Sequence, residues 1–232
     1  MPGSAVVIVQ ARTGSSRLPG KVLLPFGEST LLGHILDRLR RTGLDLWVAT
    51  TESPADDAVA DESVAHGAPV FRGDEDDVLG RFAACVDALA TEPELVVRVC
   101  ADRPFCCPVL LGELLELHAA TGAPDYVSNT VVRSYPDGLD LELVRTECLR
   151  VAAREADDPY EREHVTPFLY RRPERFRLVH ATNPFGNFAG VRAVVDTEHD
   201  YERLVEVERR LPADADYRDV LNLATLTPEL FP

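Results

Sequence analysis

The sequence predicts an α/β fold built on a mainly parallel sheet. Through the first half of the chain, short apolar runs rich in β-branched residues alternate with segments in which apolar residues recur at helical spacing. This alternation is typical of βαβ units. The composition agrees, because 45% apolar and 27% charged residues are the proportions of a globular protein with a packed core.

The first half contains four predicted strands separated by helical segments. The strands are expected at Ala5–Gln10, Leu44–Thr50, Pro69–Arg72 and Glu94–Cys100. The spacing of apolar residues predicts helices at Leu31–Leu39, Val78–Leu89 and Leu110–His118. Ser29 or Thr30 can cap the first helix, and the acidic residues before Val78 suit the start of the second.

The pattern changes beyond about Tyr126, where strands and helices no longer alternate regularly. Strands are expected at Asp125–Asn129, Leu139–Val144, Arg175–Ala181 and Arg192–Val195, and helices at Arg145–Glu155, Tyr160–Tyr170 and Asp200–Leu211. No repeat or flexible linker interrupts the chain, so we expect a single domain over residues 1–212, with a nucleotide-binding half (1–125) and an acceptor-binding half (126–212). Residues 213–232 are expected to form a loosely packed tail or a partner-docking arm.

The chain is strongly acidic, which narrows the range of functions. It carries 39 acidic residues against 24 basic ones, and its formal net charge is −15. A general nucleic-acid-binding surface is therefore not expected, because phosphate contacts need clustered Lys and Arg. Lys21 is the only lysine in the sequence, so a bound anion must be met by a local group of cations.

The sequence also predicts a cytoplasmic protein with no membrane partner. No apolar run approaches the roughly 20 residues that span a bilayer. The start MPGSAVVIVQ lacks the charged segment and cleavage site of a signal peptide. The five cysteines form no CxxC pair, so reduced thiols are expected rather than a disulfide framework or a zinc site.

The segment after the first strand reads QARTGSSRLPGK and has the composition of a triphosphate cradle. Glycines allow backbone N–H groups to approach phosphates, and Arg12, Arg17 and Lys21 supply positive charge. Its spacing fits neither a Walker A loop nor a GxGxxG fingerprint. The alternative is a solvated loop in which Gly and Ser only make turns. The candidate nucleotide-binding residues here are Gln10, Ala11, Arg12, Thr13, Gly14, Ser15, Ser16, Arg17 and Lys21.

This segment resembles the signature loop of the cytidylyltransferase family that includes the synthetases of CMP-activated acidic sugars. The resemblance is strongest to the spore coat polysaccharide biosynthesis protein F branch. It continues in order through FRGDEDDVLGRF (71–82), YPDGLDLE (135–142), REHVTP (162–167) and VDTEHD (195–200). It implies a nucleotide-diphospho-sugar transferase fold, a Rossmann-like α/β/α sandwich with a mixed, mostly parallel sheet. The nucleotide would lie above the carboxyl ends of the first strands, as in other open parallel sheets.

Two aspartates are candidate ligands for Mg²⁺, the cofactor that triphosphate chemistry calls for. Asp102 follows a buried predicted strand and Asp196 ends a short apolar run. The resemblance implies that both positions bear the metal; the alternative is that each is a turn or helix-capping residue. The segment CADRP (100–104) departs from the Thr-Gly-Asp-Cys-Pro common in relatives, because Ala101 replaces a glycine and Arg103 adds a cation. Arg103 can hold an acceptor phosphate; the alternative is that it lies across the surface.

The base and the acceptor need separate groups. Gln10, Ala11 and Arg12 are candidates for the cytosine pocket, and the acidic stretch that ends at Asp77 can receive the cytosine amino group or the ribose, unless it serves only the start of the following helix. His164 can deprotonate an acceptor hydroxyl, whereas a phosphate or phosphonate acceptor needs no base. The candidate acceptor-binding residues are Arg103, Arg133, Asp140, Glu142, Arg162, Glu163 and His164.

These residues predict an enzyme that transfers CMP from CTP to a small acidic or phosphorylated acceptor and releases pyrophosphate. Arg12, Arg17, Lys21 and Asp102 are the candidate catalytic residues. Two alternatives remain open: a nucleotidyltransferase of the same fold that uses another nucleoside triphosphate, and a non-catalytic nucleotide-binding protein. The resemblance implies a homodimer, which the long second half and apolar tail suit.

Overall fold

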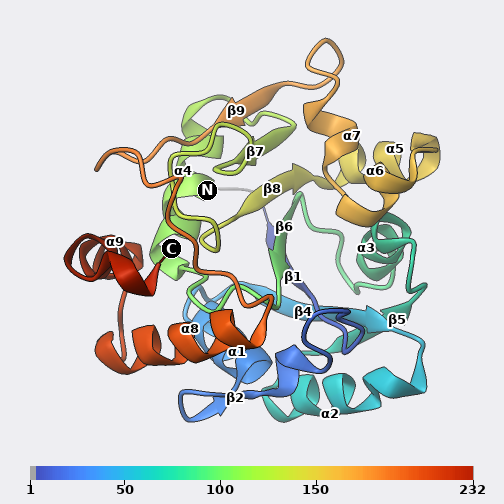
Figure 1. The fold of residues 1–232 in the computed structure, drawn as a ribbon. Coiled ribbons are helices and arrows are strands. Elements are labelled where there is room, and N and C mark those ends of the chain that lie inside the picture. Colours follow the sequence, from blue (N-terminus) through green and yellow to red (C-terminus); the bar gives the residue numbers. More distant parts are fainter. Residues whose placement is uncertain (1–3, 232) are drawn as a thin grey trace.

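An interior strand of the main sheet is β1 (Ala5–Gln10), a run of apolar residues that is buried on both faces. The computed structural model describes residues 4–231 (Figure 1). Residues 1–3, part of the amino-terminal segment considered above, and residue 232, the last of the predicted tail, lie outside the described residues. In the described part, β1 belongs to a seven-stranded sheet of order β5-β4-β1-β6-β8-β7-β9.

The sheet is mixed and mostly parallel, as predicted. The strands β5 (Val70–Gly73), β4 (Asp45–Thr51), β1 and β6 (Leu95–Cys100) run parallel to one another. The strand β8 (Glu142–Arg145) is antiparallel to both of its neighbours, β6 and β7 (Tyr126–Ser128), and β9 (Leu178–His180) is parallel to β7. A two-stranded hairpin of β2 (Pro25–Phe26) and β3 (Ser29–Thr30) lies outside this sheet.

Helices cover both faces of the sheet because successive residues of its strands point in opposite directions. Val7 and Val9 of β1 belong to the core beneath α1 (Leu31–Arg40), α2 (Asp57–Ala65), α4 (Pro108–Ala120), α8 (Glu198–Arg210) and α9 (Tyr217–Leu226). Val6 and Ile8 belong to the opposite core, beneath α3 (Val78–Asp87), α5 (Thr146–Glu155) and α7 (Pro167–Tyr170). Figure 1 shows the two groups of helices on opposite sides of the sheet. The α/β/α sandwich is confirmed.

Two predicted elements differ from the structure, and one helix between the first strands was missed. The predicted helix over 160–170 is two helices, α6 (Pro159–His164) and α7, because Val165 between them has a φ of 71°. The predicted strand over 192–195 is wrong: this segment is extended, but it forms only one bridge, from Asp137 to Arg192. The helix α2 was not predicted. Short 3₁₀ turns also occur at Lys21–Leu23, Pro54–Asp56 and Pro228–Leu230.

The carboxyl-terminal segment is not loosely packed, so that part of the prediction is wrong, while the alternative of a partner-docking arm stays a prediction. It forms α9, which begins at a capping box between Asp216 and Asp219. Tyr217, Val220 and Leu221 are buried in the same core as β1. The segment is therefore part of the folded unit up to the end of the described residues.

The parallel strands place their carboxyl ends at one edge of the sheet. The loop 11–20 leaves β1 there, and Asp102 follows β6, the neighbour of β1. Asp196 reaches the same edge because its neighbour Val195 donates a backbone hydrogen bond to the carbonyl of Asp102 at 2.9 Å. Over residues 4–231, the helices are too short or too polar to cross a membrane.

Candidate active site

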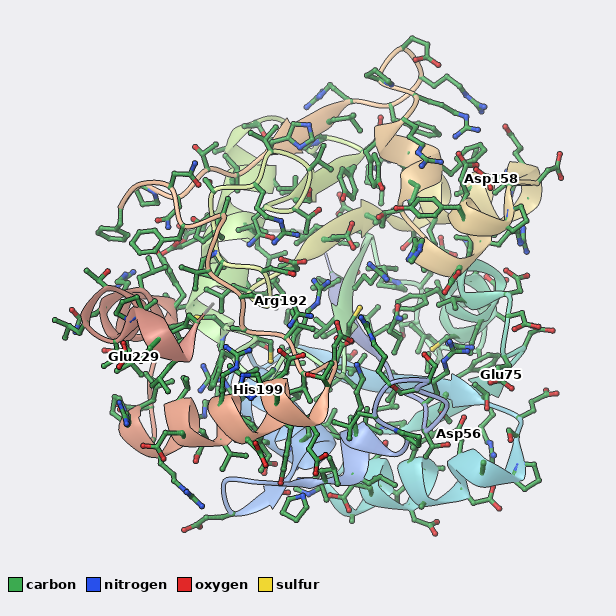
Figure 2. The ribbon with its side chains drawn as sticks, viewed as in Figure 1. Asp56, Glu75, Asp158, Arg192, His199 and Glu229 are labelled. Atoms are coloured by element: carbon green, nitrogen blue, oxygen red, sulfur yellow. The ribbon has the colours of Figure 1, made fainter. Side chains whose placement is uncertain are left out.

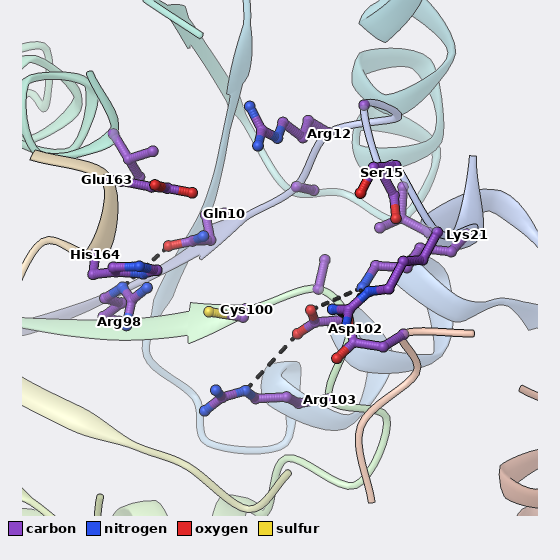
Figure 3. A pocket seen from close by; sticks show the side chains of 18 of the residues that line it. Gln10, Arg12, Ser15, Lys21, Arg98, Cys100, Asp102, Arg103, Glu163 and His164 are labelled. Carbon is purple, nitrogen blue, oxygen red and sulfur yellow. Dashed lines mark hydrogen bonds and ion pairs between the residues drawn. The ribbon is translucent and has the colours of Figure 1, made fainter. Parts of the chain in front are cut away.

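A cavity of about 430 Å³ opens at the carboxyl ends of β1 and β6 (Figure 3). It is lined mainly by the loop after β1, by the segment after β6 and by residues of α3 and α6. Most predicted nucleotide-binding residues line it, namely Gln10, Ala11, Arg12, Gly14, Ser15, Ser16, Arg17 and Lys21, together with Asp102, Asp196, Arg103, Glu163 and His164.

Thr13 does not line this cavity but anchors the loop. Its backbone N–H and its hydroxyl both donate to Asp56 Oδ1, each at 2.7 Å. Its carbonyl accepts from the N–H groups of Ser15 and Gly20, at 2.8 and 2.9 Å. Burial raises the pKa of Asp56, but hydrogen bonds from Thr51 and Thr13 outweigh burial and hold that pKa below its ordinary value. The loop is therefore tied to a charged carboxylate beneath it.

Lys21 lies between the two predicted metal ligands. Its ammonium is 3.0 Å from Asp102 Oδ2 and 3.1 Å from Asp196 Oδ1, and it donates to the carbonyl of Val195 at 2.6 Å. Burial raises the pKa of Asp196, but the hydrogen bond from Lys21 and the charges of Lys21, Arg17 and Arg192 outweigh burial and lower it. Both aspartates face one point at the rim of the cavity.

The two loop arginines are also paired with carboxylates. Arg17 is 2.9 Å from Asp196 Oδ1, and Arg12 is 3.6 Å from Glu75 Oε1. Glu75 belongs to the acidic stretch after β5, and Figure 2 labels it together with Asp56 and Arg192. The acidic stretch therefore packs against the loop through Glu75 rather than through Asp77.

Arg98 is a site residue that the sequence prediction missed. It stands in the middle of β6, where its Nε donates to Gln10 Oε1 at 3.0 Å (Figure 3). Its guanidinium also pairs with Glu142. A single charged residue inside the apolar run Leu95–Cys100 was the signal that could have identified it. Arg81, Val78, Val22, Cys100 and Ala101 also line the cavity and were not predicted.

A second cavity of about 410 Å³ adjoins the first, and the two share Arg98, Arg103 and His164. The second cavity is built from the antiparallel half of the sheet and from α6 and α7. Its other lining residues are Thr130, Val131, Arg133, Asp140, Glu142, Tyr160, Thr166, Pro167 and Tyr170. Five predicted acceptor residues, Arg103, Arg133, Asp140, Glu142 and His164, are thus brought together, whereas Glu163 lines only the first cavity.

Asp140 organises the arginines of the second cavity. Arg133 binds it through two hydrogen bonds of 2.7 and 3.0 Å, and Arg103 pairs with the same carboxylate. Burial raises the pKa of Asp140, but the charges of Arg103 and Arg133 outweigh burial and lower it. Glu142 is saturated in a similar way, because it pairs with Arg98 and accepts from the hydroxyls of Tyr126 and Thr166.

Asp77 and Arg162 line neither cavity, so the structure does not place them where the sequence analysis expected a nucleotide and an acceptor. They pair with each other instead, with Arg162 Nε donating to Asp77 Oδ1 at 2.8 Å. Asp77 also caps α3 by accepting from the N–H of Gly80 at 2.8 Å. The pair therefore joins α3 to α6, which supports the helix-start alternative for Asp77.

The residues at the rim of the first cavity fit a hard divalent cation. Three oxygens, from two carboxylates and the Val195 carbonyl, converge on the position of the Lys21 ammonium, and Mg²⁺ prefers oxygen ligands. Asp102 Oδ1 is buried without a hydrogen-bond partner. Within residues 4–231 there is no cluster of three or more His, Cys, Asp or Glu side chains that could hold a metal ion. The Val195 carbonyl and oxygens of water or phosphate would therefore complete the coordination shell of the cation.

Comparisons with known proteins agree with this geometry. A cytidylyltransferase family model matches residues 6–224. The spore coat polysaccharide biosynthesis protein SpsF of Bacillus subtilis is 35% identical over 208 residues, which cover 85% of this chain and 83% of SpsF. A cytidylyltransferase structure from Leptospira borgpetersenii superimposes with a TM-score of 0.91 at 29% identity and covers 98% of this chain and 96% of that chain.

A more distant neighbour shares the fold. It is a CMP:2-keto-3-deoxy-manno-octonic acid synthetase solved in complex with CTP, with a TM-score of 0.67 at 18% identity; the match covers 89% of this chain and 99% of that chain. At that identity the likeness shows the nucleotidyltransferase fold. The family match spans most of the chain, and the identity to SpsF extends over both of its halves. The chain therefore belongs to the cytidylyltransferase family.

Proposed function

We propose that the protein transfers CMP from CTP to an oxygen of a small anionic acceptor and releases pyrophosphate. The observation that carries the proposal is the pair of adjoining cavities: one holds the loop of Arg12, Arg17 and Lys21, and the other holds an arginine cluster. Because they share Arg98, Arg103 and His164, a nucleotide in the first cavity and an acceptor in the second would meet at one place. Holding two reactants together is the main contribution of an enzyme to such a transfer.

The loop after β1 would bind the triphosphate. Arg12, Arg17 and Lys21 supply the positive charge, and Gly14, Ser15 and Ser16 line the same cavity. Gln10 and Ala11 at the end of β1 would face the base. Arg98 Nε can only donate, so the hydrogen bond to Gln10 Oε1 leaves the Gln10 amide nitrogen as a donor for an acceptor atom on the base.

Asp102 and Asp196 would hold Mg²⁺, which, when bound, offsets charge on the phosphates and on the leaving pyrophosphate. The rest of the chemistry falls to the chain itself. The acceptor oxygen would form a bond to the α-phosphorus while the bond from that phosphorus to the bridging oxygen breaks. The departing pyrophosphate would remain beside the loop cations until it is released.

The second cavity would bind the acceptor, and its charge favours an anion. Three arginines line it against two carboxylates, and those carboxylates are already paired. One positive charge is therefore in excess, in a chain whose net charge is −15. His164 lines both cavities and would take the proton of an attacking hydroxyl; an acceptor oxygen that is already ionised needs no base.

The proposal is tested by measuring pyrophosphate release with CTP and a panel of hydroxy acids, sugar phosphates and phosphonates. The proposed function requires release that depends on both CTP and one class of acceptor. Thermal-shift titration with CTP, UTP, ATP and GTP in the presence of Mg²⁺ identifies the preferred donor. A shift with CTP and no release with any acceptor would favour a non-catalytic nucleotide-binding protein instead.

A further inference from the structure

The single lysine of the chain occupies the position at which a divalent cation would bind. Its ammonium lies within 2.6–3.1 Å of three oxygens, those of Asp102, Asp196 and the Val195 carbonyl. The side chain is only 10% exposed. An ammonium and a divalent cation cannot share that position, because they would need the same oxygens and would repel each other.

The other loop cations are held in the same way. Arg17 shares Asp196 Oδ1 with Lys21, and Arg12 is paired with Glu75. Arg192 adds a third cation to Asp196 through the other carboxylate oxygen. Without nucleotide, the cations that would bind phosphate are therefore neutralised by carboxylates, two of which are the proposed metal ligands.

We propose that Lys21 acts as a built-in cation that excludes divalent metal from the nucleotide-free protein. The proposal rests on the proposed function, because it assumes that a triphosphate binds at this loop. When the triphosphate arrives, its oxygens replace the carboxylates as partners of Lys21 and Arg17. The carboxylates are then free for the metal, so metal and nucleotide bind together and each favours the other.

The identity of the residue fits this role. An ammonium is a compact point charge with three donors, and it can be surrounded by three oxygens as an ion is. A planar guanidinium fits a flat pair of oxygens better. Of the 24 Lys and Arg residues in the chain, 23 are arginine, and the one lysine is Lys21.

The test is a titration of nucleotide-free protein with Mn²⁺ alone, followed by electron paramagnetic resonance of the free ion. Lys21→Met removes the ammonium and should bind Mn²⁺ about tenfold more tightly than the wild type. Arg150→Met is the matched control, because Arg150 is a cation paired with Asp87 and Glu92 away from the cavities. It should leave Mn²⁺ affinity unchanged. Equal or weaker Mn²⁺ binding by Lys21→Met would overturn the proposal.

A second variant tests the same exchange from the nucleotide side and serves if Lys21→Met does not fold. Asp196→Asn removes a charge that holds both Lys21 and Arg17. With EDTA present, it should bind CTP about tenfold more tightly than the wild type in calorimetry. Unchanged or weaker metal-free binding would contradict the exchange. The Mn²⁺ titration uses neither nucleotide nor acceptor, so its outcome is separate from a failure of the transferase assay.

Discussion

Arg103 and Asp140 form an ion pair in the lining of the second cavity, and Asp140 also binds Arg133 through two hydrogen bonds. Asp140 is 5% exposed, so this carboxylate fixes two guanidiniums in a largely buried position. Two arginines held by one carboxylate retain a net positive charge. The pair thus leaves a net positive charge in the wall of the second cavity, beside Asp102.

Arg103→Met should weaken binding of the acceptor more than binding of the nucleotide. Loss of one guanidinium removes the excess charge of the second cavity, and we expect the acceptor KM to rise about tenfold or more. The Kd for CTP should change less than about threefold, since the triphosphate is assigned to other residues. Steady-state kinetics and calorimetry measure the two effects. An equal loss in both constants would assign Arg103 to the nucleotide instead.

Asp77 should contribute to stability and not to nucleotide binding. Asp77→Ala removes the cap of α3 and the pair with Arg162, and we expect it to lower the free energy of unfolding by about 1–2 kcal/mol. Asp77→Asn keeps a capping oxygen and should lose less. Urea unfolding measures the stability, and a CTP titration should give both variants the same Kd as the wild type. A large loss of CTP affinity in Asp77→Asn would restore the nucleotide-binding assignment.

The carboxyl-terminal helix should behave as part of the core. Leu221 is 4% exposed whereas Leu226, on the same helix, is 69% exposed. Leu221→Ala should lower the free energy of unfolding by about 2–4 kcal/mol, because it removes buried methyl groups and leaves a cavity. Leu226→Ala should change it by less than about 0.5 kcal/mol. Similar small effects of both changes, measured by urea unfolding, would indicate a detached helix.

His34 should make the protein less stable in mild acid. Burial and, next, the charges of Arg38 and Arg41 lower the pKa of His34 from 6.5 to about 4. Between pH 6.5 and about pH 4, His34 is therefore protonated in the unfolded chain and neutral in the folded chain. The part of the unfolding free energy that depends on neutral His34 is fully present above pH 6.5 and is lost as the pH falls toward about 4.

The His34→Gln variant isolates this effect. Between pH 7 and pH 5, the wild type should lose about 2 kcal/mol more unfolding free energy than the variant. Urea unfolding at both pH values gives the comparison. A variant that loses as much stability as the wild type over that range would show that His34 is protonated in the folded state.

The parallel half of the sheet was predictable because its strands are short runs rich in apolar and β-branched residues, most clearly in Ala5–Gln10. The helix α2 was missed because only Val59 and Ser63 of it are buried, which leaves no apolar stripe to detect. The helix α9 was predictable in principle: Tyr217, Val220, Leu221 and Ala224 recur at helical spacing after Asp216.

The site was predictable only in part. The loop after β1 could be identified because its glycines, hydroxyl residues and cations are close together in the sequence. Asp102 could be identified because it directly follows a predicted strand. The side chains that contact these residues could not be identified from the sequence, since those contacts depend on the order of the strands in the sheet. Arg98 meets Gln10 because β6 lies beside β1, and it meets Glu142 because β8 pairs with β6. Asp77 and Arg162 are 85 residues apart in the sequence, and only the packing of α3 on α6 shows that they bind each other.

The most direct test follows the label of [α-³²P]CTP with the acceptor panel. Transfer of CMP predicts that label appears in one acceptor with an equal amount of pyrophosphate, and that Asp102→Asn, which loses one carboxylate facing the Lys21 ammonium, reduces transfer at least about a hundredfold. UTP and ATP should support far less transfer. Bound CTP without labelled product for any acceptor, or unimpaired transfer by Asp102→Asn, would contradict the account.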